Sequence, residues 1–237
     1  MDNSQRLVVV TGGSKGIGRA IVERFASEGY AIATCSRDEA DLEQLKKEVL
    51  EQSGVSIHTL KADLSKKDEV VHFVEFIRMI ARPVDVLVNN SGRFIPGLVH
   101  EEKEGNMEEM IETNLYSAYN VSRGLIPAMK RERRGHIFNI CSVASIMAYP
   151  NGGSYSISKF AMYGMSKALR EEMKEFGIRV TAVLPGAVLT SSWEGVELPE
   201  ERFIKSEDVA ETIYSSYQLS ERTVIEDIVI RPQLGDI

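Results

Sequence analysis

The chain has 237 residues, of which 43% are hydrophobic and 27% charged, and its formal net charge is −7 at pH 7. This length suits one large core, and no window of about 18 apolar residues could cross a bilayer. The acidic balance argues against broad contact with nucleic acid or an anionic membrane, and the start "MDNSQRLVVVTGG" lacks the features of a signal peptide, so we expect a cytoplasmic protein without those partners.

Short apolar runs alternate with longer segments of helical period along the chain. The expected strands cover 7–10, 31–35, 55–60, 84–88, 136–141, 179–184 and 224–230. The expected helices cover 17–28, 38–52, about 106–132 and 153–176, and another begins at Ser206. Several strand runs are apolar without alternation, which is typical of strands covered on both faces. The pattern predicts an α/β fold in one domain, 1–237, with a doubly wound parallel sheet of about seven strands and helices on both faces.

The first expected strand runs into a glycine-rich turn, "VVVTGGSKGIGRAI", with Gly12, Gly16 and Gly18 ahead of the first helix. Glycines allow the backbone to turn tightly and to approach a pyrophosphate, and the free N–H groups of a helix N-terminus face its negative charge. Because the pattern stands between a strand and a helix, it predicts a dinucleotide site rather than an ordinary tight turn.

The spacing of this turn, G-x-x-x-G-x-G, resembles that of the short-chain dehydrogenase/reductase family. The resemblance continues in order along nearly the whole chain, through "NNSG" at 89–92, Asn114, Ser142, "YSISK" at 155–159 and "PGAVLT" at 185–190. Ser91 departs from the alanine that the family usually has, which is a small change. The resemblance implies a Rossmann-type fold and a nicotinamide-dependent oxidoreductase.

Charge at the end of the second strand predicts which dinucleotide binds. A carboxylate there usually reads a free ribose 2′-hydroxyl, whereas a 2′-phosphate needs cations. In "TCSRDE", Ser36 stands in the place of the carboxylate and Arg37 follows it, while Lys15 adds a second cation from the glycine turn. Asp38 is better placed as the N-cap of the next helix. We therefore expect NADP(H).

The family resemblance extends the expected cofactor site beyond the glycine turn. It implies that Asp63 meets the adenine, that Asn90 and Gly92 line the ribose, and that Val188 and Thr190 hold the nicotinamide carboxamide. The expected cofactor site then comprises Gly12, Ser14, Lys15, Gly16, Ile17, Gly18, Arg37, Asp63, Leu64, Asn90, Ser91, Gly92, Tyr155, Lys159, Pro185, Gly186, Val188 and Thr190.

The spacing of cysteines and histidines gives no support to metal chemistry. Cys35 and Cys141 lie in two separate strand-like runs, and the four histidines at 58, 72, 100 and 136 are scattered. We expect buried free thiols and no metal site.

The stretch "GGSYSISKFAMYGMSKAL" contains two tyrosine–lysine pairs at four-residue spacing, Tyr155–Lys159 and Tyr163–Lys167. A helix rises about 1.5 Å per residue, so the second tyrosine lies about 12 Å farther along the axis. The helix that follows strand 136–141 must start near the carboxyl end of that strand, so only Tyr155 begins near the nicotinamide. We expect Tyr163 to be a packing or interface residue.

The first pair predicts acid–base chemistry. A free phenol has a pKa of about 10, so Tyr155 needs help near neutral pH. Lys159, one turn later, is expected to favour the phenolate and to hydrogen-bond the ribose. The family resemblance implies that Ser142 polarises the substrate carbonyl and that Asn114 relays protons through water to Lys159. These catalytic residues together predict reduction of a ketone by hydride from NADPH, with Tyr155 as the proton donor.

Substrate choice is expected to lie in a lid at about 186–206 and in two aromatic residues, Tyr149 and Trp193, that could stack on a flat substrate. The segments "PGAVLTSSW" and "SERTVIEDIVIRPQLGDI" resemble the bacterial sepiapterin-reductase-like branch of the family, which implies a small carbonyl such as a pterin side-chain ketone. A 3-oxoacyl-(acyl-carrier-protein) reductase is the alternative within the family, and an inactive NADP(H)-binding sensor or scaffold is the alternative outside it. The family also implies a homodimer or homotetramer formed through helices 106–132 and 153–176.

Overall fold

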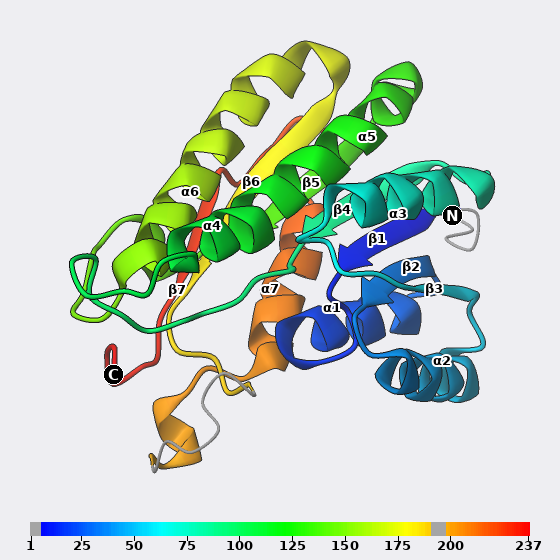
Figure 1. Cartoon of the computed structure of the whole chain (residues 1–237). Coiled ribbons are helices and arrows are strands. Elements are labelled where there is room, and N and C mark those ends of the chain that lie inside the picture. The colour runs from blue at the N-terminus through cyan, green and yellow to red at the C-terminus, as the bar shows by residue number, and fades with distance from the viewer. Residues whose placement is uncertain (1–5, 191–197) are drawn as a thin grey trace.

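The computed structural model describes residues 6–190 and 198–237. Its strands form one sheet in the order β3-β2-β1-β4-β5-β6-β7, and every neighbouring pair is parallel (Figure 1). The strands are β1 (Leu7–Thr11), β2 (Ala31–Ser36), β3 (Ile57–Lys61), β4 (Val84–Asn89), β5 (Gly135–Ile140), β6 (Ile178–Pro185) and β7 (Asp227–Ile230). The expected doubly wound parallel sheet is confirmed.

Helices cover both faces of the sheet (Figure 1). One face carries α1 (Gly16–Ser27), α2 (Glu39–Ser53) and α7 (Ser206–Tyr217). The other carries α3 (Lys67–Met79), α5 (Ser117–Glu132) and α6 (Gly153–Met173), and the short helix α4 (Asn106–Ile111) leads into α5. α3 is not among the helices expected from the sequence, although Val70, Phe73 and Ile77 recur on its buried side.

Strand β1 shows why the apolar runs do not alternate with polar residues. Val8 and Val10 point into the core under α1 and α7, whereas Leu7 and Val9 point into the core under α3 and α5. All four side chains are fully buried. A strand covered on both faces has no solvent side on which a polar residue would be favoured.

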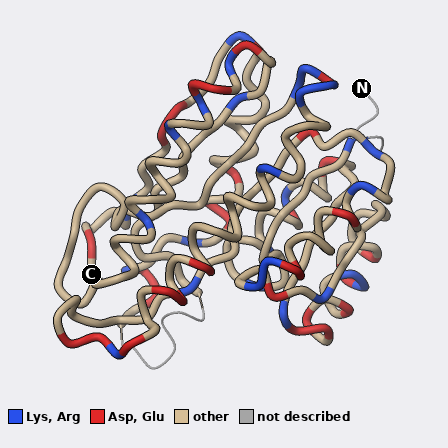
Figure 2. The backbone as a smooth tube through the Cα atoms, turned by 45° about the horizontal axis from the view of Figure 1, so that its top comes forward, with Lys and Arg blue, Asp and Glu red and all other residues tan. Residues whose placement is uncertain are grey.

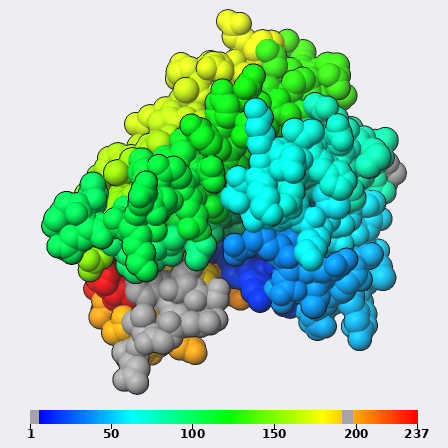
Figure 3. Space-filling model, in the orientation of Figure 1, coloured from blue at the N-terminus to red at the C-terminus, as the bar shows by residue number. Residues whose placement is uncertain are grey.

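The direction of the strand order reverses between β1 and β4. β1 is followed outward by β2 and β3, and β4 is followed by β5, β6 and β7. Ligands of such sheets bind beyond the carboxyl ends of the strands at this reversal. In the space-filling view, dark blue atoms from the N-terminal part of the chain are recessed between the green and light-blue segments (Figure 3).

Two elements differ from their expected bounds at the edges of the sheet. β3 begins at Ile57 rather than 55, and β7 begins at Asp227 rather than 224. Before β7, the hydroxyl of Thr181 donates to the carbonyl oxygen of Ile225 at 2.6 Å. A side chain of β6 therefore takes a backbone acceptor there, and the regular ladder starts later.

The helix expected over 106–132 is confirmed, but it is not α-helical throughout. A π-helical turn, Glu112–Tyr116, separates α4 from α5. A π-turn adds a residue to the helical repeat and is rarely visible in hydrophobic spacing, because it changes the facing of side chains without ending the helix. The helix expected over 153–176 is confirmed as α6, with its last three residues, 174–176, in a 3-10 turn.

Charged residues of both signs alternate over the outer helices (Figure 2). Pairs at helical spacing, such as Arg19 with Glu23 and Arg24 with Glu28, account for part of this pattern. None of the helices in the described ranges is long and apolar enough to cross a membrane. Within the same ranges, no three His, Cys, Asp or Glu side chains gather in a way that could hold a metal ion.

Candidate active site

The glycine turn between β1 and α1 has the geometry of a phosphate cradle. Gly12 and Gly16 adopt positive φ angles of 65° and 52°, and a Cβ on Gly18 would lie 2.2 Å from the carbonyl oxygen of Gly12. Within the described part of the chain, the N-cap residue Lys15 makes no side-chain cap, so N–H groups of the first turn stay available to an anion. Ile17 packs partly against the core. These residues fit a dinucleotide pyrophosphate.

Side chains after β4 brace this turn. The Asn90 amide donates to the carbonyl oxygens of Thr11 and Gly12 at 3.0 Å each. The Ser91 N–H donates to the hydroxyl of Thr11 at 3.0 Å. The structure therefore brings Asn90 and Ser91 to the glycine turn, as the cofactor prediction requires, and uses the Asn90 amide to hold the turn in shape.

The residues expected to read a 2′-phosphate lie at the end of β2 beside the glycine turn. The hydroxyl of Ser14 donates to that of Ser36 at 2.8 Å, and the exposed Arg37 directly follows Ser36. Lys15 forms an ion pair with Asp41 at 2.7 Å, with both side chains partly exposed. Lys15 and Arg37 therefore directly follow the two serines of one hydroxyl pair, and Lys15 already has Asp41 as a partner.

Two aspartates near this end of the site accept hydrogen bonds from backbone N–H groups. Asp38 accepts hydrogen bonds from two N–H groups in the first turn of α2, which confirms its expected role as N-cap. Asp63 accepts from the N–H of Ser65 at 3.1 Å and from its hydroxyl at 2.8 Å. The intervening Leu64 is buried. The loop after β3 is thus held in a fixed turn.

The segment after β6 reaches back to the glycine turn. The N–H of Gly186 donates to the carbonyl oxygen of Ile230 at 2.8 Å, and Val188 is buried. Thr190 lies against Gly16, where a Cβ would come within 3.0 Å of its methyl carbon. The two ends of the predicted cofactor site, far apart in sequence, are therefore neighbours in space.

Three of the predicted catalytic side chains converge where β5 ends and α6 begins. Ser142 follows β5 and accepts a hydrogen bond from the N–H of Ala144 at 3.1 Å, and its hydroxyl is near enough to the phenol of Tyr155 to lower the pKa of that phenol. The Nζ atom of Lys159 lies 5.7 Å from the centre of the Tyr155 ring. It donates to the carbonyl oxygen of Ile140 at 2.9 Å.

Burial governs how this group titrates. Burial raises the pKa of Tyr155 well above that of a free phenol, and the nearby Ser142 hydroxyl opposes only part of the rise. It lowers the pKa of Lys159 to about 8. In this structure the Lys159 ammonium donates to the Ile140 carbonyl oxygen, and the expectation that it favours the phenolate stays a prediction. Tyr155 keeps its proton at neutral pH, which suits a proton donor.

Asn114 lies fully buried in the π-turn between α4 and α5. Its Oδ1 accepts from the N–H of Arg93 at 2.7 Å, and its Nδ2 donates to the Arg93 carbonyl at 3.0 Å and to the Ser158 hydroxyl at 2.9 Å. A Cβ on Gly92 would lie 3.1 Å from Asn114 Oδ1 and 3.5 Å from Lys159 Nζ. The π-turn thus places Asn114 between the loop after β4 and the helix that carries Lys159.

The second tyrosine–lysine pair has a different environment. The hydroxyl of Tyr163 donates to a carboxylate oxygen of Asp227, in the edge strand β7, at 2.7 Å. The Nζ atom of Lys167 lies 4.3 Å from the centre of the Tyr163 ring. The pair ties α6 to the edge of the sheet, in agreement with the packing role that helix direction predicts.

Two contacts escaped sequence reasoning. A Cβ on Gly13 would lie 2.2 Å from the hydroxyl of Thr34, so this glycine is required by the neighbouring strand. The ring of Phe94 meets that of Tyr155 edge to face, with centres 4.9 Å apart. The doubled "GG" is a signal that could have drawn attention to Gly13, whereas nothing in the loop sequence fixes where Phe94 points.

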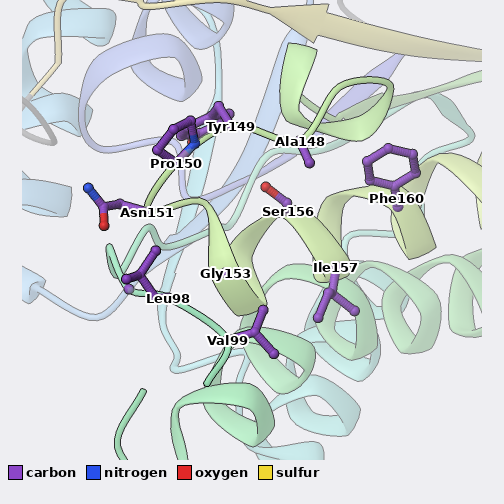
Figure 4. A pocket seen from close by; sticks show the side chains of 11 residues that line it. Leu98, Val99, Ala148, Tyr149, Pro150, Asn151, Gly153, Ser156, Ile157 and Phe160 are labelled. Carbon is purple, nitrogen blue, oxygen red and sulfur yellow. The ribbon is translucent and has the colours of Figure 1, made fainter. Parts of the chain in front are cut away.

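A pocket of about 420 Å³ opens beside the first turns of α6 (Figure 4). It is lined by Gly97, Leu98, Val99, Ala148, Tyr149, Pro150, Asn151, Gly153, Ser156, Ile157 and Phe160. Successive helix residues are rotated by about 100°, so Ser156 and Phe160 are turned roughly 100° and 140° from Tyr155. Tyr155 is not among the lining residues, although Tyr149, which is, lies near enough to raise the pKa of the Tyr155 phenol.

The predicted substrate residues are only partly placed. Tyr149 lines this pocket, and burial raises the pKa of its phenol. Trp193 lies outside the described residues, as does the part of the expected lid at 191–197. The described parts of the lid are joined by a bridge between Val188 and Ile204.

Comparisons with known proteins agree with this geometry. Residues 6–201 match the family model described as short chain dehydrogenase. A sepiapterin reductase of Chlorobaculum tepidum is 32% identical to this chain, and the match covers 98% of each sequence. A 3-oxoacyl-(acyl-carrier-protein) reductase of Staphylococcus epidermidis is 31% identical, over 86% of this chain and 88% of its own.

A solved structure shares the whole fold. An alcohol dehydrogenase from the archaeon Thermococcus sibiricus, complexed with 5-hydroxy-NADP, superposes with a TM-score of 0.91 at 28% identity, covering 98% of each chain. The sheet, the glycine turn and the helices described above therefore belong to an arrangement already known with a nicotinamide dinucleotide bound.

Proposed function

The chain belongs to the short chain dehydrogenase family, and on that premise we propose that it is an NADPH-dependent carbonyl reductase, which converts a ketone to a secondary alcohol. The observation that supports this proposal best is the convergence of Ser142, Tyr155 and Lys159 beside Gly92, at the carboxyl end of the sheet and next to the glycine turn. A proton donor beside a dinucleotide cradle is what reduction of a carbonyl requires.

The proton chemistry follows from the titration of the site. When bound, the reduced nicotinamide supplies the hydride that the carbonyl carbon receives. Tyr155, neutral at physiological pH, donates its proton to the carbonyl oxygen as negative charge develops there, and Ser142, whose hydroxyl lies near the same phenol, polarises that oxygen. Lys159, whose pKa of about 8 lies close to neutrality, returns a proton to Tyr155. Asn114 holds the loop and the helix on either side of this path.

The proposed cofactor is NADP(H) rather than NAD(H). Arg37 and Lys15 supply positive charge around Ser36, where a carboxylate would oppose a 2′-phosphate. The archaeal alcohol dehydrogenase that shares this fold was solved with a nicotinamide dinucleotide of the phosphorylated type. The remaining cofactor contacts are proposed at Asp63, Asn90, Val188 and Thr190, in the places described above.

The proposed substrate is a small flat ketone such as a pterin side chain. The Chlorobaculum tepidum sepiapterin reductase, which matches over 98% of each sequence, supports this choice. The staphylococcal 3-oxoacyl-(acyl-carrier-protein) reductase supports the alternative of an acyl thioester. The third alternative is an NADP(H)-binding sensor without turnover. Unlike both reductases, it would bind NADPH without oxidising it. We also propose that residues 1–237 form one domain and that copies associate through α5 and α6.

The test is oxidation of NADPH, followed by absorbance, with sepiapterin, a small diketone and a 3-oxoacyl thioester offered separately. We expect fastest turnover with sepiapterin, and the Tyr155→Phe protein serves as the blank. Faster turnover of the thioester would transfer the assignment to the acyl reductases. Tight binding of NADPH without oxidation on any of the three would sink the enzyme proposal and leave the sensor.

A further inference from the structure

Helix α6, which carries Tyr155, receives its N-terminal cap from a distant part of the chain. Its own N-cap residue is Gly152, which has no side chain to offer. Glu102, in the loop between β4 and α4, accepts a hydrogen bond from the N–H of Ser154 at 2.8 Å through Oε1, and its Oε2 accepts from the Ser154 hydroxyl. The carboxylate thus satisfies one of the free N–H groups that every helix start exposes.

The surroundings of Glu102 are shaped to admit it. A Cβ on Gly153 would lie 1.8 Å from Glu102 Oε1, and a Cβ on Gly97 would lie 2.7 Å from Glu102 Cγ. The N–H of Gly97 also donates to the carbonyl oxygen of Asn151 at 3.0 Å. Two glycines therefore make room for the carboxylate, and the backbone of the loop is hydrogen-bonded to a residue just before the helix.

We propose that Glu102 is a positioning residue for Tyr155. Ser154 directly precedes Tyr155, so a carboxylate that accepts from the N–H and the hydroxyl of Ser154 fixes the helical turn from which the phenol extends. The same loop places Phe94 against the Tyr155 ring. A negative charge at a helix N-terminus is also favoured by the helix dipole. This inference rests on the proposed role of Tyr155 as proton donor.

The first measurement does not depend on turnover. Amide hydrogen exchange at Ser154 and Tyr155 should become faster in Glu102→Ala, because the acceptor of the Ser154 N–H is lost. Glu101→Ala is the matched control, since Glu101 is in the same turn but its side chain is largely exposed. Exchange that is unchanged in Glu102→Ala would overturn the inference.

The second measurement is kcat, with whichever carbonyl of the panel is turned over. Small misplacements of a reacting group cost up to about 100-fold in rate, so we expect Glu102→Ala to lower kcat by about 10- to 100-fold while the Kd of NADPH stays within about twofold. Glu102→Gln keeps an oxygen that can accept from the Ser154 N–H and should restore kcat to within about threefold of the wild type. A normal kcat in Glu102→Ala, or a parallel loss of NADPH binding, contradicts a positioning role.

A milder variant covers the case in which Glu102→Ala does not fold. Ser154→Ala removes only the bond to Oε2 and keeps the N–H, so kcat should fall by about threefold with the Kd of NADPH unchanged; an unaltered kcat would count against the inference. Tyr155→Phe distinguishes failure of the proposed function from failure of the role of Glu102. If that protein retains turnover, the proposed function fails, whereas full activity of Glu102→Ala beside an inactive Tyr155→Phe removes only the role of Glu102.

Discussion

The Nζ atom of Lys159 donates a hydrogen bond to the carbonyl oxygen of Ile140 at 2.9 Å, from a side chain that is almost completely buried. A buried ammonium loses hydration that a single carbonyl does not replace, and this loss lowers the pKa of Lys159 from 10.5 to about 8. The cation is therefore held in the site at a cost to stability, and its charge changes close to physiological pH.

We predict that kcat/KM for NADPH falls above about pH 8, by about tenfold per pH unit. This parameter reports the pKa values of the free enzyme, and above that pH Lys159 loses the proton that we propose it returns to Tyr155. The measurement is initial rate against pH between 6 and about 10. Lys159→Arg, whose guanidinium keeps its charge, should lose the descending limb even if its rate is low. An identical limb in that variant would assign the titration to another group.

Replacement of Lys159 by an apolar residue should stabilise the fold while it destroys activity. The folded-state pKa of Lys159 lies below the ordinary value, so its charged form destabilises the native state below about pH 8, and native stability rises between pH 8 and 10.5 as the proton leaves. We expect Lys159→Met to raise the free energy of unfolding by up to about 3 kcal/mol at pH 7 and by less than about 1 kcal/mol at pH 10. Urea unfolding at both pH values tests this; equal gains would exclude the buried charge as the cause.

The two tyrosine–lysine pairs should respond differently to loss of the hydroxyl. Tyr155→Phe is expected to abolish turnover and to leave NADPH binding nearly intact, because the substitution removes the proposed proton donor but does not change the glycine turn. Tyr163→Phe removes only the hydrogen bond to Asp227 and should cost at most about 1 kcal/mol of stability with little change in rate. A collapse of kcat in Tyr163→Phe would mean that the wrong pair has been chosen.

Much of this distinction could be predicted from the sequence. The direction of α6 follows from the alternation of strands and helices, and that direction selects Tyr155 over Tyr163. The glycine turn was also located correctly, because glycine at a positive φ leaves a trace in the sequence itself. Residues whose role is set by local backbone conformation were therefore the easiest to find.

Residues whose role depends on tertiary contacts were not accessible in the same way. Asn114 could be assigned only by family resemblance, because the π-turn that directs it toward Arg93 and Ser158 has no periodic signal. The hydrogen bond from Lys159 to the carbonyl oxygen of Ile140 was not predicted either, since a one-turn spacing along a helix does not reveal a contact with the neighbouring strand. Glu102 acts on a helix that begins 51 residues later, which no local pattern indicates.

Cofactor choice should follow the charge at the end of β2. Arg37→Asp places a carboxylate beside the expected 2′-phosphate, so the ratio of kcat/KM for NADPH to that for NADH should fall at least about tenfold. The measurement is steady-state kinetics with both dinucleotides. Lys174→Asp, at the far end of α6, controls for the change of net charge. An unchanged ratio in Arg37→Asp would remove Arg37 from the phosphate site.

At Gly18 in the glycine turn, helix propensity favours a substitution by alanine whereas steric fit opposes it. Gly18 lies inside α1, where alanine would normally be favoured over glycine by about 1 kcal/mol. Its Cβ would however lie 2.2 Å from the carbonyl oxygen of Gly12, so Gly18→Ala must push the turn out of shape and should weaken NADPH binding by about 10- to 100-fold.

Gly164 provides the matched control for that substitution. It lies inside α6, and a Cβ there would meet no atom within 4 Å in the described part of the chain, so Gly164→Ala should raise the free energy of unfolding by about 0.5–1 kcal/mol and leave the Kd of NADPH unchanged. Fluorescence titration with NADPH and thermal unfolding of both variants give the two readouts. The steric conflict with Gly12 means that Gly18→Ala must displace the turn. If this variant nevertheless binds NADPH like the wild type, the pyrophosphate does not approach the turn.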